Sequence, residues 1–375
     1  MGFDSFHGNR QTVDRLREML ARDRFPHAII LAGPRGAGKF TLAQMLAKAM
    51  NCQAFRERGT AGLESGATTE LPDFCGQCES CVKIAQADDL DARFTEAVEA
   101  REALREVDKK ETRILVQTHP EVLIVPPDPP QMMIKVDQVR HVIETAYHRP
   151  ELGGRRVYIF TESSFMKEAA NSLLKILEEP PEFATIFLLT ENAGAFLPTI
   201  RSRCVSFTLA PLKPKEIEHF VAKAHPDWNM SQRQLAARIS NGAVGSAASL
   251  DLAAYVTARK DALTLLNAAI EADDHSALFR MTETYRAGAE GREKIEQLLR
   301  TAYWLLQDMM YVKSGTPEMI RNTDLLTEIQ RLASSVDFDW ITRAVQGLSD
   351  VESGMRRNLL RSLSLDAFAA SLPRG

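Results

Sequence analysis

A glycine-rich loop between a buried strand and a helix constrains this fold more than any other feature of the sequence. The apolar run His27–Gly33 predicts a strand, and residues 33–41, with the sequence GPRGAGKFT, lead into a helical pattern over Leu42–Met50. This order is typical of a P-loop, whose backbone N–H groups and lysine bind phosphate, although a plain turn between strand and helix is the alternative. The loop supplies five candidate nucleotide-binding residues: Gly33, Gly36, Gly38, Lys39 and Thr41.

The positions that hold magnesium in a P-loop ATPase have changed in this chain. Phe40 stands where a Ser or Thr hydroxyl would bind Mg²⁺, and Thr41 comes one residue late, turned by about 100° around the helix. A second predicted strand, Arg156–Phe160, is followed by Thr161 and Glu162 in place of an acidic pair. Glu162 is either a remaining base or a solvated charge. Because Mg²⁺ neutralises the transferred phosphoryl group, we expect no hydrolysis. We also expect ATP binding to be weak or absent.

Four of the five cysteines lie close together in the sequence. Cys75, Cys78 and Cys81 are separated by two-residue spacers, and 22 residues separate Cys52 from Cys75. Four thiolates suit tetrahedral Zn²⁺ and leave no open position, so such a metal would be structural. A ferredoxin-type cluster would need a cysteine at position 85, which is alanine. Ordinary unligated thiols are the alternative, since a disulfide framework is unlike so long a chain.

Composition restricts the function classes. The 375 residues are 45% hydrophobic, enough for a large core. A total of 46 Lys and Arg against 50 Asp and Glu gives a net charge of −4, so no overall positive field draws this chain to nucleic acid. Any DNA contact is local or shared with partners. No apolar run approaches the roughly 20 residues that span a bilayer, and we expect a soluble cytoplasmic protein without a membrane partner.

Three further segments carry a resemblance to a known family: Lys167–Pro181, Ala184–Thr190 and Leu197–Cys204. In this order, and together with the P-loop, they resemble the AAA+ clamp-loader subunits of bacterial DNA polymerase III, in particular the delta-prime subfamily. The resemblance extends over about residues 3–250. It implies an α/β P-loop AAA+ domain with a parallel sheet and a zinc module, a small helical lid domain and an all-α C-terminal collar domain.

The same resemblance implies roles for individual residues. In this family the Ser-Arg-Cys triplet, here residues 202–204, carries an arginine finger that reaches the nucleotide site of the neighbouring subunit. Arg203 would be that finger; the alternative is an arginine that anchors its own loop. Ser246 stands where motor subunits carry a sensor arginine in the lid. Thr190 and Asn192 are both candidates for the polar sensor at the end of the preceding strand.

The resemblance and the composition together predict three domains. Residues 1–209 form the AAA+ domain, with the zinc module at 52–81 and a solvated, charged helical insertion at 88–113. Residues 210–252 form the lid and residues 253–375 the collar. One apolar face is expected in the collar, formed by Ile295, Leu298, Leu299, Ala302, Leu305, Leu306, Met309 and Met310.

The function that the resemblance implies is that of a stator, a subunit that does not hydrolyse ATP itself. It would assemble with gamma/tau and delta subunits and support the loading of the sliding clamp onto primed DNA. One rival is an ATP-hydrolysing motor subunit of the gamma/tau type, in which Thr41 and Glu162 take over magnesium binding. The other is an unrelated P-loop nucleotide-binding protein, such as a kinase.

Overall fold

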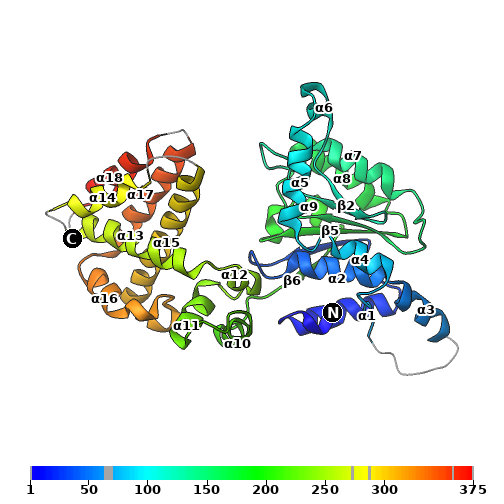
Figure 1. Cartoon of the computed structure of the whole chain (residues 1–375), viewed down its shortest axis with the longest axis horizontal. Coiled ribbons are helices and arrows are strands. Elements are labelled where there is room, and N and C mark those ends of the chain that lie inside the picture. The colour runs from blue at the N-terminus through cyan, green and yellow to red at the C-terminus, as the bar shows by residue number, and fades with distance from the viewer. Residues whose placement is uncertain (1, 63–70, 272–273, 286–288, 357–358, 374–375) are drawn as a thin grey trace. The chain divides into compact units, whose positions relative to one another are not determined.

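The computed structural model describes residues 2–62, 71–271, 274–285, 289–356 and 359–373. It divides into two compact units (Figure 1). The first comprises Met1–Glu216 and Asn241–Ser246, and the second comprises Ile217–Ser240 and Ala247–Gly375. The predicted domain boundaries at 209/210 and 252/253 stay a prediction.

A six-stranded sheet forms the centre of the first unit. Its strands are β1 (Ala28–Ala32), β2 (Val116–His119), β3 (Val122–Val125), β4 (Arg156–Phe160), β5 (Ala184–Thr190) and β6 (Val205–Thr208). Their order is β2-β3-β4-β5-β1-β6, and every neighbouring pair is parallel except β2 and β3. The predicted α/β fold with a parallel sheet is therefore confirmed. The carboxyl ends of β1, β4 and β5 meet at one edge, where ligands bind in such folds.

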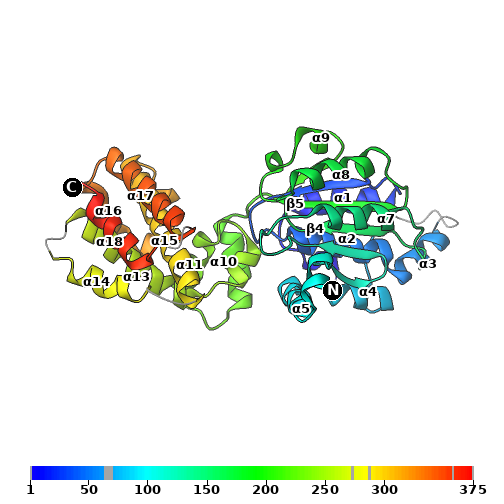
Figure 2. The ribbon, with the colours of Figure 1, turned by 90° about the horizontal axis from the view of Figure 1, so that it is seen from above.

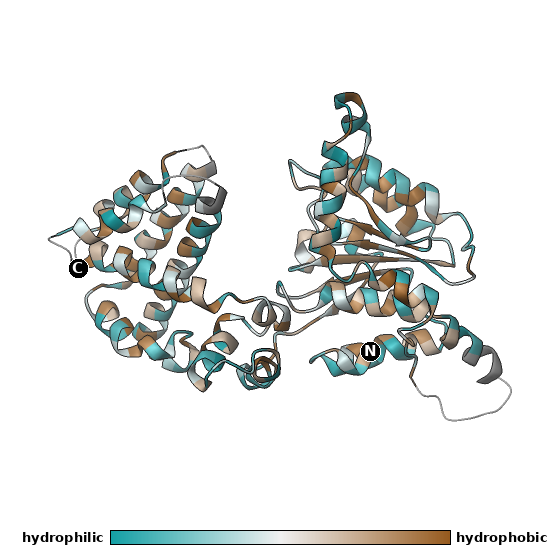
Figure 3. Ribbon diagram, in the orientation of Figure 1, coloured by the Kyte–Doolittle hydropathy of each residue, from teal (hydrophilic) through white to brown (hydrophobic). Residues whose placement is uncertain are grey.

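Both faces of this sheet are covered, which explains why the inner strands β1, β3 and β5 are almost continuously apolar (Figure 3). Side chains alternate between the faces along each strand: in β1, Ile29 and Leu31 belong to one core, and Ile30 belongs to the other. Helices α1, α2 and α4 pack on the first face, and α7 and α8 on the second (Figures 1 and 2).

The helices of the first unit are α1 (Arg10–Ala21), α2 (Lys39–Asn51), α3 (Gln53–Gly62), α4 (Glu79–Ala85), α5 (Leu90–Glu102), α6 (Glu106–Glu111), α7 (Val136–Ala146), α8 (Lys167–Glu178) and α9 (Pro198–Arg201). Short 3₁₀ turns lie at Phe3–Ser5 and Ala193–Ala195. The 22 residues between Cys52 and Cys75 begin with helix α3, which ends at Gly62. Residues 63–70 lie outside the described residues.

The second unit is described by helices alone, as the loss of strand patterns after position 210 predicts. They are α11 (Met230–Ile239), α13 (Leu252–Ile270), α14 (Ser276–Glu283), α15 (Ala289–Lys313), α16 (Leu326–Ser334), α17 (Phe338–Arg356) and α18 (Arg361–Ser371), with 3₁₀ turns at Pro317–Met319 and Thr323–Leu325. Helices α10 (Pro214–Ala224) and α12 (Val244–Ala248) each begin in the first unit and end in the second.

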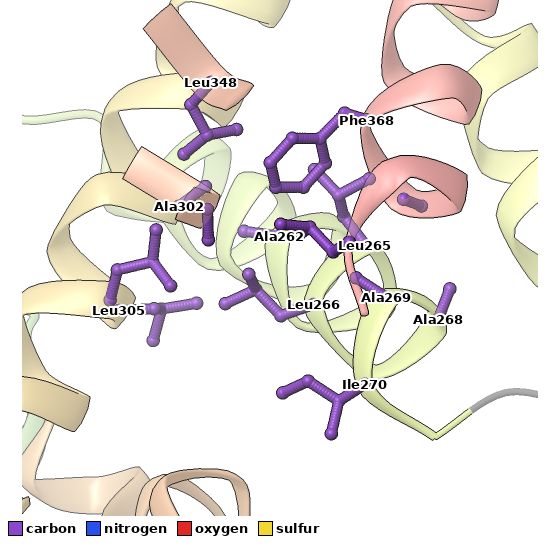
Figure 4. Packing of buried hydrophobic residues seen from close by; sticks show 14 of the residues in the cluster. Ala262, Leu265, Leu266, Ala268, Ala269, Ile270, Ala302, Leu305, Leu348 and Phe368 are labelled. Atoms are coloured by element: carbon purple, nitrogen blue, oxygen red, sulfur yellow. The ribbon is translucent and has the colours of Figure 1, made fainter. Parts of the chain in front are cut away.

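The predicted apolar face of α15 is the centre of the second unit's core. Its residues from Ile295 to Met309 are buried, and Leu305 packs beside Leu266 of α13, with Leu348 of α17 and Phe368 of α18 in the same cluster (Figure 4). Met310 is the exception, because it is 43% exposed. It follows Met309 by one position and so points about 100° away from the buried face. Among the described helices, none is long and apolar enough to span a membrane.

Candidate functional site

A cavity of about 450 Å³ lies at the carboxyl ends of β1, β4 and β5. The P-loop follows β1, and the N–H of Gly33 donates a hydrogen bond of 3.2 Å to the carbonyl of Thr190, the last residue of β5. Lys39 begins helix α2. The P-loop residues Gly36, Gly38, Lys39 and Thr41 line the cavity together with residues that follow β4 and β5.

Two glycines are required by the shape of this loop. Gly36 and Gly38 have φ values of +77° and +85°, a region that side chains disfavour. A Cβ at Gly36 would lie 2.6 Å from the backbone nitrogen of Ser246, and one at Gly38 would lie 2.9 Å from the ring of Phe6. The loop is therefore held closely on its outer side, and any larger residue at these positions would displace it.

The first turn of α12 is one of the parts holding the loop. The N–H of Gly245 donates to the carbonyl of Gly36 at 2.8 Å, and the hydroxyl of Ser246 donates to the carbonyl of Arg35 at 3.2 Å. The residue at the predicted sensor position thus binds the P-loop backbone. A serine hydroxyl is neutral, so this position brings no positive charge into the cavity.

Lys39 is the lysine of the P-loop. Its ammonium group donates to the carbonyls of Gly33 at 2.7 Å and Pro34 at 2.8 Å, which leaves one of its three donors for a phosphate. Burial lowers the pKa of Lys39, and the nearby charges of Glu191 and Glu162 oppose that shift.

The residues at the positions that bind magnesium in a P-loop ATPase also line the cavity. Phe40, Thr41, Thr161 and Glu162 all contribute to its wall. Glu162 is exposed as a residue, yet partial burial of its carboxyl group raises its pKa, and the charge of Glu191 raises it further. Its role as a base or as a solvated charge stays open, but it lies at the site and not on a remote surface.

Glu191 is a cavity residue that the sequence analysis missed. The residues on either side of it, Thr190 and Asn192, are the two candidate sensors. The hydroxyl of Thr190 donates to the carbonyl of Asn192 at 2.9 Å, and the Asn192 side chain accepts from the N–H of Gly194. Of Glu191 and Asn192, only Glu191 is among the residues that line the cavity. Its place directly after a buried strand beside the P-loop strand was the available signal.

The charged insertion is less solvated than its composition indicates. Leu90, Asp91 and Phe94, in the first turns of α5, line the P-loop cavity. At the other end of α5, Arg101 is buried and its guanidinium contacts Asp128 at 2.7 Å. The insertion thus contributes to one wall of the site, and the prediction of a solvated helix does not hold at Arg101.

Asp128 is fully buried and gathers three donors from separate segments. They are the guanidinium of Arg101, the ammonium of Lys135 at 2.8 Å and the N–H of Ile114 at 3.1 Å. Burial alone would raise the pKa of Asp128, but these hydrogen bonds together hold it below its usual range. The carboxylate therefore fixes α5, and with it the cavity wall, to the loop before α7.

We expect Asp128→Asn to lower the free energy of unfolding by about 3 kcal/mol, because the buried Arg101 and the partly buried Lys135 lose the counter-charge that they share. The wild type should also lose this contribution in acid. Its folded-state pKa lies below the unfolded value of about 4, so the stabilisation is complete above that pH and disappears as the pH falls. Urea unfolding at pH 7 and pH 3 measures both effects. Asp137→Asn, at a more exposed pair with Arg113, is the matched control and should cost under about 1 kcal/mol.

Arg203 lies just after the short helix α9 and is partly exposed. Its guanidinium donates to the carbonyl of Thr199 at 2.9 Å and forms an ion pair of 2.7 Å with Glu178 at the end of α8. Both partners lie near the surface, with 35% of the Arg203 side chain exposed. Arg201 is exposed as well, and no partner for its side chain is present in the described part of the chain.

The four clustered cysteines come together beside the core of the first unit. Cys52 ends α2, Cys78 precedes α4 and Cys81 lies within α4. All four sulfur atoms lie within 4.8 Å of one another. The long spacer does not keep Cys52 away, because the N–H of Cys75 donates to its sulfur at 3.3 Å.

The donor set of this cluster fits a metal ion. Bonds of about 2.3 Å in a tetrahedron place sulfur atoms about 3.8 Å apart, which agrees with four sulfur atoms that all lie within 4.8 Å of one another. Burial raises the pKa of Cys52 and Cys81, so a cation is needed to hold these two as thiolates. Burial acts in the same direction on Cys75, but the N–H groups of Gln77 and Cys78 lower its pKa to about 6. The cluster can therefore bind a metal such as zinc.

The fold and these two sites define a P-loop AAA+ protein with a cysteine-rich metal module. The sequence profile of the family described as DNA polymerase III, delta subunit matches residues 8–213, more than half of the chain. The chain therefore belongs to this clamp-loader family.

Individual relatives carry more than one subunit name. Subunit delta' of Bacillus subtilis is 23% identical over 92% of this chain and 90% of its own length. Subunit delta' of Pseudomonas aeruginosa is 29% identical over 55% of this chain and 50% of its own length. Subunit tau of Escherichia coli is 26% identical over 78% of this chain, which spans 42% of that relative.

Proposed function

We propose that this chain is a stator subunit of the delta-prime type in the clamp loader of DNA polymerase III. It would assemble with gamma/tau and delta subunits, without hydrolysing ATP itself, and help the assembly place the sliding clamp on primed DNA. Residues 253–375 would act as its collar and residues 210–252 as its lid. The two delta' relatives support this subunit type.

One observation carries the proposal: at two positions of the cavity, the residues that would bind magnesium through oxygen in a P-loop ATPase are replaced. Phe40 follows the P-loop lysine, and Thr161 follows β4 at the position where a carboxylate would be needed. Without Mg²⁺, the charge that develops on a transferred phosphoryl group is not neutralised. Energy would then come from a neighbouring motor subunit, whose site would receive Arg203 in trans. The metal of the cysteine cluster would be a structural Zn²⁺, because four thiolates leave no position for a substrate.

We expect the isolated full chain to show no magnesium-dependent ATP turnover above background, and Lys39→Ala to leave that result unchanged. Reconstitution with motor subunits, delta, clamp and primed DNA should restore clamp loading only when this chain is present. Steady-state phosphate release and a clamp-loading assay measure these results. Turnover by the isolated chain that Lys39→Ala abolishes would contradict the stator proposal.

That contrary result would favour a second candidate, an ATP-hydrolysing subunit of the gamma/tau type. The tau relative and the presence of Thr41 and Glu162 in the cavity wall favour this candidate. In that case Thr41→Ala and Glu162→Gln should each lower turnover by at least about a hundredfold.

A further inference from the structure

Two carboxylates follow adjacent strands at the P-loop cavity. In the register of β4 and β5, Phe160 pairs with Leu188, so Glu162 is at the level of Thr190 and close to Glu191. The first residue of the P-loop is beside them, because the N–H of Gly33 donates to the carbonyl of Thr190. Both carboxylates and Lys39 line the same cavity.

The charges around this cavity do not favour an anion. Its lining includes two cations, Arg35 and Lys39, and three acidic residues, Asp91, Glu162 and Glu191. Two of the three donors of Lys39 are bound to backbone carbonyls. Binding a polyphosphate would need an excess of positive charge, from the lysine, a second cationic side chain or a metal ion. Here the formal excess is negative, and the sensor position holds Ser246.

We propose that Glu191, together with Glu162, excludes nucleoside polyphosphates from this chain's own P-loop cavity. Glu191 is thus a specificity-determining residue: it repels the phosphates that the glycine loop would otherwise accept. This inference rests on the proposed stator role and adds to it, since the loss of magnesium ligands accounts for absent hydrolysis but not for absent binding. The pKa of Glu162 supports the same picture: burial raises it, and the charge of Glu191 raises it further, as expected of two carboxylates that lie close together.

The test is the affinity of the full chain for ATP, measured by calorimetry with and without Mg²⁺. Glu191→Gln should bind ATP about tenfold more tightly than wild type at low salt, because one charge facing a multiply charged phosphate chain is removed. The double variant with Glu162→Gln should bind more tightly still. The difference should shrink in 1 M salt, where the screening length falls to about 3 Å.

Glu182→Gln is the matched control, because it removes an exposed glutamate that does not line the cavity. It should leave the affinity for ATP unchanged, and thermal unfolding should show that all variants are folded. The inference is overturned if the variants bind no better than wild type, if the control gains as much, or if wild type already binds ATP tightly with Mg²⁺. None of these outcomes touches the role of Arg203 in a neighbour's site, which is tested separately.

Discussion

Replacing Arg203 with alanine should lower ATP turnover in a reconstituted clamp loader by about a thousandfold at the motor site that receives it. A guanidinium supplied from a neighbouring subunit stabilises charge on the transferred phosphoryl group, and such residues are worth about 10³ to 10⁵ in rate. Assembly should be unchanged, because Arg203 is partly exposed and none of its partners is a core residue. Phosphate release from an assembly with a single active motor site, next to this subunit, measures the effect.

The contacts of Arg203 in the free chain are compatible with this role. Its ion pair with Glu178 lies at the surface, where such pairs contribute about 0 to 1 kcal/mol. Arg203 can therefore leave Glu178 and bind a phosphate at a small cost in free energy. Glu178→Gln should retain the turnover of the assembly, since it removes the competing carboxylate and leaves the guanidinium in place.

Arg201→Ala is the control, since it removes an exposed arginine two positions away, at the end of the short helix α9 that precedes Arg203. It should change turnover by less than about threefold, because a nearby charge without a direct phosphate contact acts only through screened electrostatics. Equal losses in both variants would indicate a general charge effect of this loop. If Arg203→Ala loses no turnover, Arg203 is not an arginine finger. Its role is then to anchor its own loop through the carbonyl of Thr199.

Local patterns in the sequence were sufficient for much of the fold. The P-loop was predictable because β1, the glycines and α2 are contiguous, so the motif contains its own structural context. The buried face of α15 was predictable from helical periodicity, which also explains the error at Met310. The antiparallel pairing of β2 with β3 was not predicted, because it depends on the contact between two short strands and not on a pattern in either one.

The site was harder to predict because several of its residues are brought in by distant contacts. Glu191 was missed since its neighbours Thr190 and Asn192 are the polar types expected of a sensor. The first turns of α5 were assigned to solvent on charge content, but a single buried carboxylate, Asp128, holds that helix against the domain. Residue composition describes the exposed side of such a helix and gives no information on the side that an ion pair buries.

The cysteine cluster provides the largest expected effect on stability. Cys81 is 1% exposed, and Cys52 and Cys81 belong to the same core as α1, α2 and one face of the sheet. We expect Cys81→Ser to abolish metal binding and to lower the free energy of unfolding by about 5 kcal/mol, since metal binding at structural sites contributes directly to folding. The losses should appear together, as a lower urea midpoint and as absent metal in elemental analysis of the reduced protein.

Cys204→Ser provides the matched control, because this partly buried cysteine packs beside the other face of the sheet and lies outside the cluster. It should cost about 1 kcal/mol and leave the metal content at one ion per chain. A strong chelator should destabilise the wild type and the Cys204→Ser variant by several kcal/mol, yet have no effect on Cys81→Ser, which has no metal left to lose. If the wild type purifies without metal from zinc-containing medium and a chelator leaves its unfolding unchanged, the four thiols stabilise this module by packing alone.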